Sequence, residues 1–480
     1  MLRLFRHHIP FPAIALAVVE SLFYFAILYA LVVLRAMFWD HDIAEIRIDY
    51  WILVLLSAIS FLAMASVGMY NRDVFFHMGT VVTRGAVTYP IIFIANSVFL
   101  FAIGLVGFDR ASLYYVICLA GVIVAYPVTL LVRLTFVEIV NLEVFRRRVL
   151  VLGIGELAHK INLLTREVHK GHFVVVAFVE FGSENAPHEG LEPIQPYSLL
   201  DKRHALAEFA VEQQIDEIVI ASRERRRPEG RLGRGMPVWD LLECKMLGTQ
   251  ITDFDPFWER EAAELDLDVL QPGWLIFSDG FRIDWGRQIV KRTFDVLISL
   301  AFLLFTRPIT LTAGLLVKAT SSGPVFYRQE RVGLDGKVFS VLKFRSMRED
   351  AEKDGVPQWA KQEDDRITAV GDFMRKTRID ELPQVLNVLK GDMSFIGPRP
   401  ERPYFVDDLC EKIPYCSERH RVKPGISGWA QINYPYGASE EDARRKLAYD
   451  LYYVKNRSLF LDFLILIQTV RVILWPDGVR

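Results

Sequence analysis

Residues 13–34 read AIALAVVESLFYFAILYALVVL and contain a single charged side chain, Glu20. Three further apolar stretches of similar length follow in the first third of the chain, at residues 51–70, 86–106 and 113–132. A helix of about 20 mostly apolar residues spans the hydrocarbon core of a bilayer, which is about 30 Å thick. We therefore predict a four-helix transmembrane domain over residues 1–140.

Basic residues mark one side of these stretches. Arg3 and Arg6 precede the first stretch and arginines at 146–148 follow the fourth, whereas residues 40–49 are mostly acidic. Because cytoplasmic loops carry an excess of Lys and Arg, both ends of the bundle are predicted to face the cytoplasm. Glu20 has two interpretations: a functional intramembrane charge, or a side chain that reaches back to the interface.

The composition of the 480-residue chain supports a membrane protein of several domains. Hydrophobic residues make up 52% of the sequence and the mean hydropathy is +0.23; soluble domains have about 45–50% apolar residues. The 56 basic and 58 acidic residues give a net charge of -2, which lacks the basic character of nucleic-acid-binding domains. We expect a lipid bilayer as a partner and no nucleic acid.

The four cysteines do not form a recognisable motif. Cys118, Cys244, Cys410 and Cys416 show no Cys-x-x-Cys spacing, and Cys118 lies in an apolar run. This pattern predicts neither a zinc cluster nor a disulfide framework, and it fits a reducing compartment.

The middle of the chain, residues 146–280, predicts an α/β Rossmann-like domain with a parallel sheet. A strand-like run at 149–152 leads into Gly153 and Gly155, and a helical pattern and a second strand-like run then end at Glu180. Glycines at this turn would let the backbone approach a pyrophosphate, and Glu180 is spaced to accept a hydrogen bond from a ribose hydroxyl. We therefore consider these three residues a possible nucleotide site.

Two observations bear on the chemistry of this domain. Reductases and nucleotide-sugar epimerases resemble the fold but transfer protons with a Tyr-x-x-x-Lys pair, which occurs nowhere in this chain. The six arginines of residues 223–234 are interpreted either as a solvated loop or as a contact to phosphate or lipid headgroups.

A fifth apolar stretch, at about residues 292–318, is predicted to be a re-entrant membrane helix. Basic residues stand on both of its sides, so both flanks are expected in the cytoplasm. Arg307 and Pro308 supply the predicted break, since proline lacks an N–H and clashes with the preceding turn. A kinked complete crossing is the alternative.

Charged motifs crowd the last part of the chain: KFRSM at 343–347, RKTRIDELPQ at 375–384, NVLKGDMS at 387–394, GPRP at 397–400 and PGISGWAQ at 424–431. Together they resemble the bacterial sugar transferase family, the polyprenyl-phosphate hexose-1-phosphate transferases. The resemblance runs continuously from about residue 291 to 480. It implies a mostly helical α/β catalytic domain over residues 288–480, and the whole chain resembles the large multidomain members of that family.

The resemblance implies distinct roles for Asp380 and Glu381. In that family the Asp attacks the sugar-side phosphorus of a nucleotide-sugar, releases UMP and forms a covalent phosphosugar-Asp intermediate, while the Glu engages Mg²⁺. Expected contacts to substrate phosphates are Lys343, Arg345, Arg375, Arg378 and Arg399. The motif residues expected to support them are Pro383, Gln384, Asp392, Pro398 and Pro400.

The residues around the carboxylates agree with these roles. Apolar spacing between Leu382 and Leu389 predicts a helix that Gly391 can cap, and Asp380 and Glu381 would open that helix. Adjacent helical residues point about 100° apart, so the two carboxylates would serve separate tasks. An acidic first turn that only stabilises the helix dipole is the alternative explanation.

The resemblance further implies the substrates and the setting. A UDP-sugar and undecaprenyl phosphate are the expected substrates, glucose or galactose is the expected sugar, and a homodimer is the expected assembly. The protein would lie in the bacterial inner membrane with its catalytic domain on the cytoplasmic face, at the first membrane step of exopolysaccharide or O-antigen synthesis. A membrane-bound epimerase or dehydratase and a non-catalytic scaffold subunit remain the alternative hypotheses.

Overall fold

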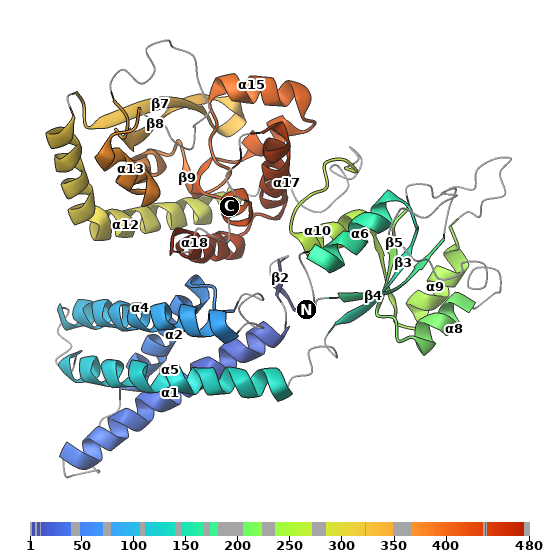
Figure 1. Cartoon of the computed structure of the whole chain (residues 1–480), viewed down its shortest axis with the longest axis horizontal. Coiled ribbons are helices and arrows are strands. Elements are labelled where there is room, and N and C mark those ends of the chain that lie inside the picture. Colours follow the sequence, from blue (N-terminus) through green and yellow to red (C-terminus); the bar gives the residue numbers. More distant parts are fainter. Residues whose placement is uncertain are drawn as a thin grey trace. The chain divides into compact units, whose positions relative to one another are not determined.

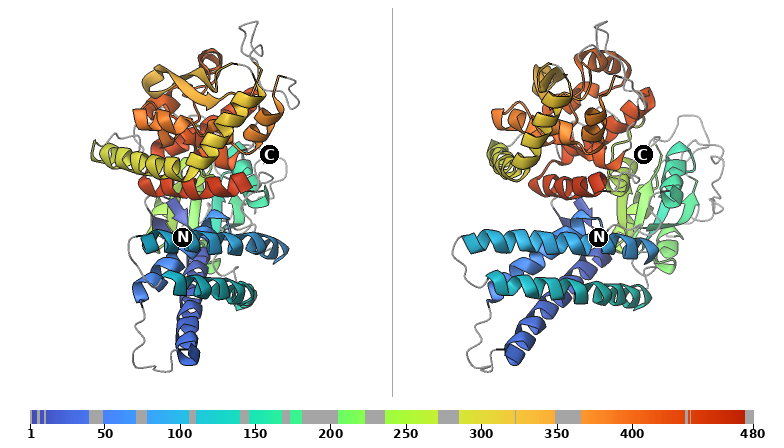
Figure 2. Two further views of the ribbon diagram at one scale, coloured as in Figure 1. Left: turned by 90° about the vertical axis from the view of Figure 1, so that its left-hand side faces the viewer. Right: turned by 60° about the vertical axis from the view of Figure 1, so that its left-hand side comes forward.

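The computed structural model of the chain is drawn in Figure 1 and, from two further sides, in Figure 2. It describes residues 2–4, 7–9, 11–39, 49–70, 78–105, 111–139, 146–167, 173–180, 205–222, 236–270, 285–321, 323–348, 366–434, 437 and 439–474. The chain divides into two compact units, Met1–Thr135 with Asp279–Arg480, and Phe136–Ser278. The finer division at 1–140, 146–280 and 288–480 stays a prediction.

The chain begins with a short antiparallel hairpin of β1 (Leu2–Leu4) and β2 (His7–Ile9). Four apolar helices then form the N-terminal bundle: α1 (Phe11–Trp39), α2 (Tyr50–Ser66), α4 (Met78–Leu105) and α5 (Ala111–Ile139). They confirm the four predicted apolar segments. The helices α1, α4 and α5 are long enough to cross a membrane, whereas α2 has 17 residues. Leu28, Leu53, Ile92 and Cys118, one from each helix, share a buried core.

Glu20 is buried and paired inside the bundle. Its carboxylate accepts hydrogen bonds from the Arg133 guanidinium on α5, 2.5 Å from Nε to Oε1 and 2.9 Å from Nη2 to Oε2. Arg133 Nη1 also donates to the carbonyl of Met69, at 2.8 Å. This bidentate pair is the strong form of a charged hydrogen bond, and it joins α1 to α5.

The second unit is built on a four-stranded parallel sheet in the order β4-β3-β5-β6, which confirms the predicted parallel arrangement. Its strands are β3 (Arg147–Leu152), β4 (Phe173–Val179), β5 (Glu217–Ile220) and β6 (Gln250–Asp253). Helices cover both faces (Figure 1): α6 (Glu156–Glu167) and α10 (Phe254–Ala262) on one, α8 (Ala205–Glu212) and α9 (Val238–Met246) on the other. Alternation along β3 sends Val149 and Val151 to the first face, and Leu150 and Leu152 to the second.

The residues of the possible nucleotide site lie at the end of β3 and β4. Gly153 has a φ of +134°, and a Cβ there would lie 2.3 Å from the carbonyl oxygen of Ala221, so only glycine fits. Gly155 stands directly before α6, and the half-buried Glu180 directly follows β4. A bound ligand stays a prediction, and the arginine-rich segment 223–234 lies outside the described residues.

The C-terminal region begins with α12 (Trp285–Thr320) and a hairpin of antiparallel strands, β7 (Phe326–Val332) and β8 (Val338–Phe344), joined by η2 (Leu334–Gly336). The helical elements that follow are α13 (Ala369–Lys376), η3 (Ile379–Glu381), α14 (Gln384–Lys390), α15 (Pro403–Lys412), η4 (Cys416–Arg421), α16 (Trp429–Asn433), α17 (Glu440–Asn456) and α18 (Leu459–Leu474). Two short parallel strands, β9 (Ser394–Ile396) and β10 (Gly425–Ser427), complete the region.

The helix α12 contains the predicted break residues Arg307 and Pro308. It stays helical through both residues and bends sharply (Figures 1 and 2). Proline removes one backbone donor and kinks a helix. The hydroxyls of Thr306 and Thr310 donate to the carbonyls of Phe302 and Thr306, at 2.7 and 2.9 Å, a type of bond that often bends helices. Whether α12 turns back in the bilayer stays a prediction.

A disulfide departs from expectation. Cys410 at the end of α15 is bonded to Cys416 at the start of η4, with 5.0 Å between their Cα atoms. The turn between them contains Tyr415 in the left-handed conformation, with a φ of +61°, which brings the two cysteines together. Cys118 and Cys244 are free and buried.

Candidate active site

The paired carboxylates lie in a tight turn between two helices. After α13 the chain passes through Arg378, whose φ of +59° is left-handed, and then forms the 3₁₀ turn η3 that holds Asp380 and Glu381. The helix α14 begins only at Gln384, after Pro383, so the expectation that the pair opens this helix is wrong. Gly391 ends α14 with a φ of +99°, as predicted. A strained backbone at this turn is typical of functional sites.

Glu381 is a buried anion clamped by cations. Its Oε1 accepts hydrogen bonds from Lys343 Nζ on β8 at 3.0 Å and from Arg399 Nη2 after β9 at 2.9 Å. Arg378 Nη1 lies 3.9 Å from the same oxygen. Burial alone would raise the pKa of Glu381, but these three cations outweigh burial and hold the pKa well below its usual range. Glu381 is therefore an anion at neutral pH.

Asp380 differs from its neighbour although it is equally buried. Among the residues that the structure describes, no side chain donates a hydrogen bond to its carboxylate. Burial and the negative charge of Glu381 raise the pKa of Asp380, while Lys343, Arg378 and Arg375 act in the opposite direction. A carboxylate that accepts no hydrogen bond from a described side chain is available as a nucleophile once it is ionised.

Lys343 stands opposite both carboxylates. Burial and, to a smaller extent, the charge of Arg399 lower its pKa, while Glu381 and Asp380 raise it, and the net direction is downward. The site thus concentrates positive charge around two adjacent acids, which is the arrangement needed to bind a substrate that carries several negative phosphate oxygens.

Most of the predicted phosphate-binding residues gather here, but Arg345 does not contact either carboxylate. Its Nη2 donates to the carbonyl and the hydroxyl of Ser321, at 3.0 and 2.8 Å, just after α12. Two of its other nitrogens, Nε and Nη1, are buried without a hydrogen-bond partner among the described residues. The geometry makes Arg345 a link to the end of α12, and its contact to a substrate phosphate stays a prediction.

The predicted motif residues form the frame of the site. Gln384 is buried in the first turn of α14. Asp392 pairs with Lys390 at 2.9 Å, while the carbonyls of Pro398 and Pro400 accept hydrogen bonds from Gly425 N at 2.9 Å and Arg331 Nη1 at 3.0 Å. These contacts hold the loop that carries Arg399 in place.

Two further side chains support the site: Asn387, which opens the motif at 387–394, and Arg419, which lies outside the motifs. Asn387 on α14 donates to the carbonyl of Ser340 at 2.7 Å and accepts from the N–H of Leu342 at 3.0 Å, which fixes β8 against α14 beside Lys343. Arg419 on η4 donates to the carbonyl of Arg399 at 3.0 Å and pairs with the buried Asp450 at 2.7 Å. Burial raises the pKa of Asp450 to about 6.

The carboxylate of Glu381 is suited to bind a metal ion together with the phosphates of a substrate. No group of three or more His, Cys, Asp or Glu side chains that could hold a metal occurs in the described part of the chain. The contacts that Glu381 makes to described residues fall on Oε1, which leaves Oε2 available. Mg²⁺ is often bound by one or two carboxylates together with substrate phosphates, and this geometry suits that mode.

The C-terminal region is similar to known proteins. Residues 286–476 match the family model described as bacterial sugar transferase. The chain is 48% identical over 191 residues to UDP-N-acetylgalactosamine-undecaprenyl-phosphate N-acetylgalactosaminephosphotransferase of Aeromonas hydrophila, covering 40% of this chain and 45% of that protein. It is 42% identical over 185 residues to UDP-glucose:undecaprenyl-phosphate glucose-1-phosphate transferase of Escherichia coli K12, covering 38% and 40%.

A shorter relative is covered almost completely. The uncharacterized sugar transferase EpsL of Bacillus subtilis is 42% identical over 195 residues, which cover 40% of this chain and 91% of that protein. By contrast, the chain spans less than half the length of the Aeromonas and Escherichia relatives.

Proposed function

Because the chain belongs to the bacterial sugar transferase family, we propose that it moves a hexose-1-phosphate from a UDP-sugar to undecaprenyl phosphate and releases UMP. The names of the Aeromonas and Escherichia relatives state undecaprenyl phosphate as acceptor and support this reaction. The observation that carries the proposal is the contrast between two adjacent buried acids. Glu381 accepts hydrogen bonds from Lys343 and Arg399, while the Asp380 carboxylate accepts none from the side chains in the described part of the chain.

In the first step a carboxylate oxygen of Asp380 attacks the sugar-side phosphorus of the UDP-sugar. A new bond forms between this oxygen and phosphorus, the bond from phosphorus to the bridging oxygen breaks, and UMP leaves with the electron pair. Asp380 then carries the hexose phosphate as an acyl phosphate. A covalent intermediate of this kind divides one difficult exchange into two easier steps.

In the second step an oxygen of undecaprenyl phosphate attacks the same phosphorus. The bond between phosphorus and the Asp380 oxygen breaks, the free carboxylate returns, and the lipid carries a diphosphate-linked hexose. Lys343, Arg378 and Arg399 offset the negative charge that gathers when one anion approaches another. Neither step consumes or releases a net proton when both phosphates are fully ionised.

Glu381 Oε2 would hold Mg²⁺ together with oxygens of the pyrophosphate. When bound there, the ion would supply Lewis-acid charge to the phosphoryl oxygens. The clamp on Oε1 keeps Glu381 ionised, which is the state that a hard cation needs.

We also propose the setting of the reaction. The protein would lie in the bacterial inner membrane as a homodimer, with α12 re-entrant and the site at the cytoplasmic face, and it would begin exopolysaccharide or O-antigen synthesis. The transferred sugar would be glucose or galactose, although N-acetylgalactosamine joins the list because of the Aeromonas relative. A nucleotide bound by Gly153, Gly155 and Glu180 in a Rossmann-like domain is a separate proposal.

The test is Mg²⁺-dependent release of UMP from a panel of UDP-sugars by the purified full chain, with and without undecaprenyl phosphate. We expect one or a few donors to react, with the lipid required for turnover. Asp380→Asn should reduce the rate by about 10³-fold or more. Asp372→Asn is the matched control, because Asp372 forms only an exposed pair with Lys376.

Two outcomes would count against the proposal. Full activity of Asp380→Asn would remove the covalent intermediate. No release from any donor, with NAD bound to the purified protein, would favour the epimerase or dehydratase hypothesis instead.

A further inference from the structure

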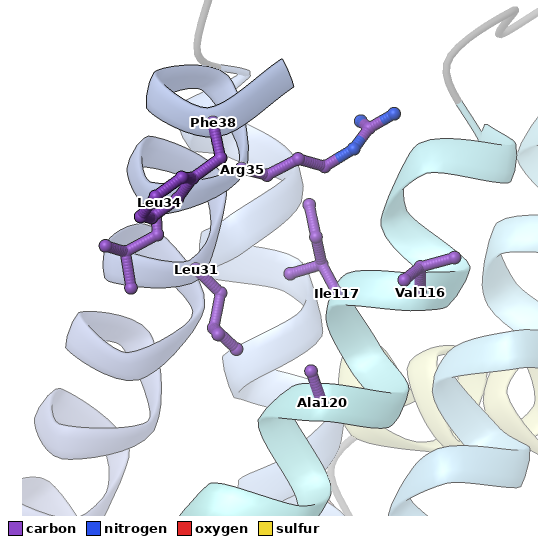
Figure 3. A pocket seen from close by; sticks show the side chains of 7 residues that line it. All are labelled: Leu31, Leu34, Arg35, Phe38, Val116, Ile117 and Ala120. Carbon is purple, nitrogen blue, oxygen red and sulfur yellow. The ribbon is translucent and has the colours of Figure 1, made fainter.

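A groove opens between α1 and α5 near the end of the bundle that holds the α1–α2 connection. Its volume is about 420 Å³. Six of its side chains are apolar and the seventh is an arginine; Figure 3 shows them all: Leu31, Leu34, Arg35, Phe38, Val116, Ile117 and Ala120. This site lies in the N-terminal bundle and takes no part in the proposed reaction.

Small residues on α5 create the floor of the groove. One turn deeper in the bundle, Leu28 packs so closely on Gly121 that a Cβ there would lie 2.8 Å from Leu28 Cδ2. Ala120 and Leu31 stand directly above this contact and leave space between the helices. Leu34, Phe38 and Val116 are exposed at the rim, so the groove opens toward the surface that lipid would cover.

The depth of the groove follows from the lengths of its helices. The 29 residues of α1 make a helix of about 43 Å at about 1.5 Å per residue, longer than a hydrocarbon core of about 30 Å. Arg35 stands one turn before the end of α1, and Val116 lies in the second turn of α5. In a bilayer that spans the middle of α1, the arginine would lie near the headgroups, while Leu31 and Ala120 would lie toward the acyl chains.

Arg35 is the unusual member of this lining. It forms no ion pair and no hydrogen bond through its side chain with any residue that the structure describes, whereas Arg133, which is buried in the same bundle, is paired with Glu20. Its side chain extends from α1 toward α5 and lies over Ile117 (Figure 3). A half-buried arginine beside apolar walls is complementary to an amphiphile with one phosphate and a hydrocarbon tail.

We propose that this groove is a binding site for a phospholipid. The lipid phosphate would accept hydrogen bonds from Arg35, and an acyl chain would lie along Leu31, Ile117 and Ala120. The positive-inside pattern of the flanking residues assigns this site to the outer leaflet of the membrane. The planar guanidinium favours an anionic headgroup with an accessible phosphodiester, such as phosphatidylglycerol.

Native mass spectrometry of the full chain in detergent, with phosphatidylglycerol added, tests the proposal. We expect one tightly held lipid per chain. Arg35→Gln should weaken its retention about 10-fold or more, since a hydrogen bond to a charged group is lost. Ala120→Phe should have a similar effect because it fills the groove while the arginine stays. Ala102→Phe adds the same bulk at an exposed site on α4 and should retain the lipid.

Four results would overturn the proposal. The first is no lipid adduct on the wild-type chain, as when a carboxylate of the α1–α2 connection pairs with Arg35 instead. The second is that Arg35→Gln and Ala120→Phe each retain the lipid as well as the wild-type chain does. The third is that the Ala102→Phe control loses the lipid as much as Ala120→Phe does. The fourth is displacement of phosphatidylglycerol by an equal concentration of undecaprenyl phosphate, which would assign the groove to the polyprenyl lipid.

Discussion

Lys343 and Arg399 reach Glu381 from two different parts of the chain, so each can be removed while the carboxylate keeps one partner. We predict that Lys343→Ala lowers kcat for UMP release by about 10²–10³-fold, the range seen when one donor to a developing charge is deleted. Lys376→Ala removes only an exposed helix pair and should change kcat less than twofold. Wild-type kcat in Lys343→Ala would show that the clamp has no role in catalysis.

The raised pKa of Asp380 predicts an acidic limb in the pH profile. Asp380 must be ionised to attack, so kcat/KM should fall as the pH drops through its pKa, at a pH above the usual value of about 4 for Asp. Protonation of a group whose folded pKa is raised stabilises the fold as pH falls, so this group's titration would not unfold the chain.

Lys343 supplies the control for that profile. Its charge lowers the pKa of Asp380, so the acidic limb should move to higher pH in Lys343→Ala. The limb can be measured from the residual activity of this variant between about pH 4 and pH 8. A limb that stays at the wild-type pH would assign it to another group.

At the level of elements, Asn387 on α14 holds β8 in place through two hydrogen bonds to its backbone. Asn387→Leu would leave the carbonyl of Ser340 and the N–H of Leu342 without their partner in a part-buried place. We predict a loss of about 2 kcal/mol in the free energy of unfolding, measured by denaturant titration in detergent. Asn433→Ala removes one local bond from an exposed side chain and should cost clearly less. Equal losses of stability in Asn387→Leu and Asn433→Ala would contradict the role of Asn387 in holding β8 against α14.

The sequence predicts these elements well where one residue type decides the local geometry. Apolar runs of the right length located the four bundle helices, and Gly391 located the end of α14. The proline in α12 predicted a deformation, and α12 bends while it remains one helix. The turn η3 was missed since the left-handed conformation of Arg378 has no signature in residue type.

The candidate site was predictable from its motifs only in part. The motifs indicated which charges belong together, and most of them do meet around Asp380 and Glu381. The partners of Arg345 and Arg399, by contrast, lie far along the chain at Ser321 and Arg419, and no periodicity links such positions. The Cys410–Cys416 bond was missed for a similar reason, because it depends on a turn rather than on a spacing motif.

At the level of the whole molecule, the buried pair of Glu20 and Arg133 decides how α1 meets α5. Glu20→Gln would leave the Arg133 charge without its counter-ion, and we predict a loss of about 3–5 kcal/mol in stability, measured by thermal unfolding in nanodiscs. Glu156→Gln changes an exposed acid and is the control.

A double variant separates pairing from packing. Replacing both partners, as Glu20→Leu with Arg133→Met, should recover most of the stability, because no unpaired charge remains in the bundle. A double variant that is less stable than Glu20→Gln alone would show that the bundle needs these polar groups for another reason.

The strand order of the sheet has a consequence for how the chain is made. The central strand β3 pairs on one side with β5, and Val149 meets Glu217, so 68 residues must be synthesised before that neighbour exists. At about 5–20 residues per second a ribosome needs roughly 3–14 s for this stretch. During that time β3 has an open edge that other chains can join. Nascent protein stalled between these strands should therefore be the form most in need of a chaperone.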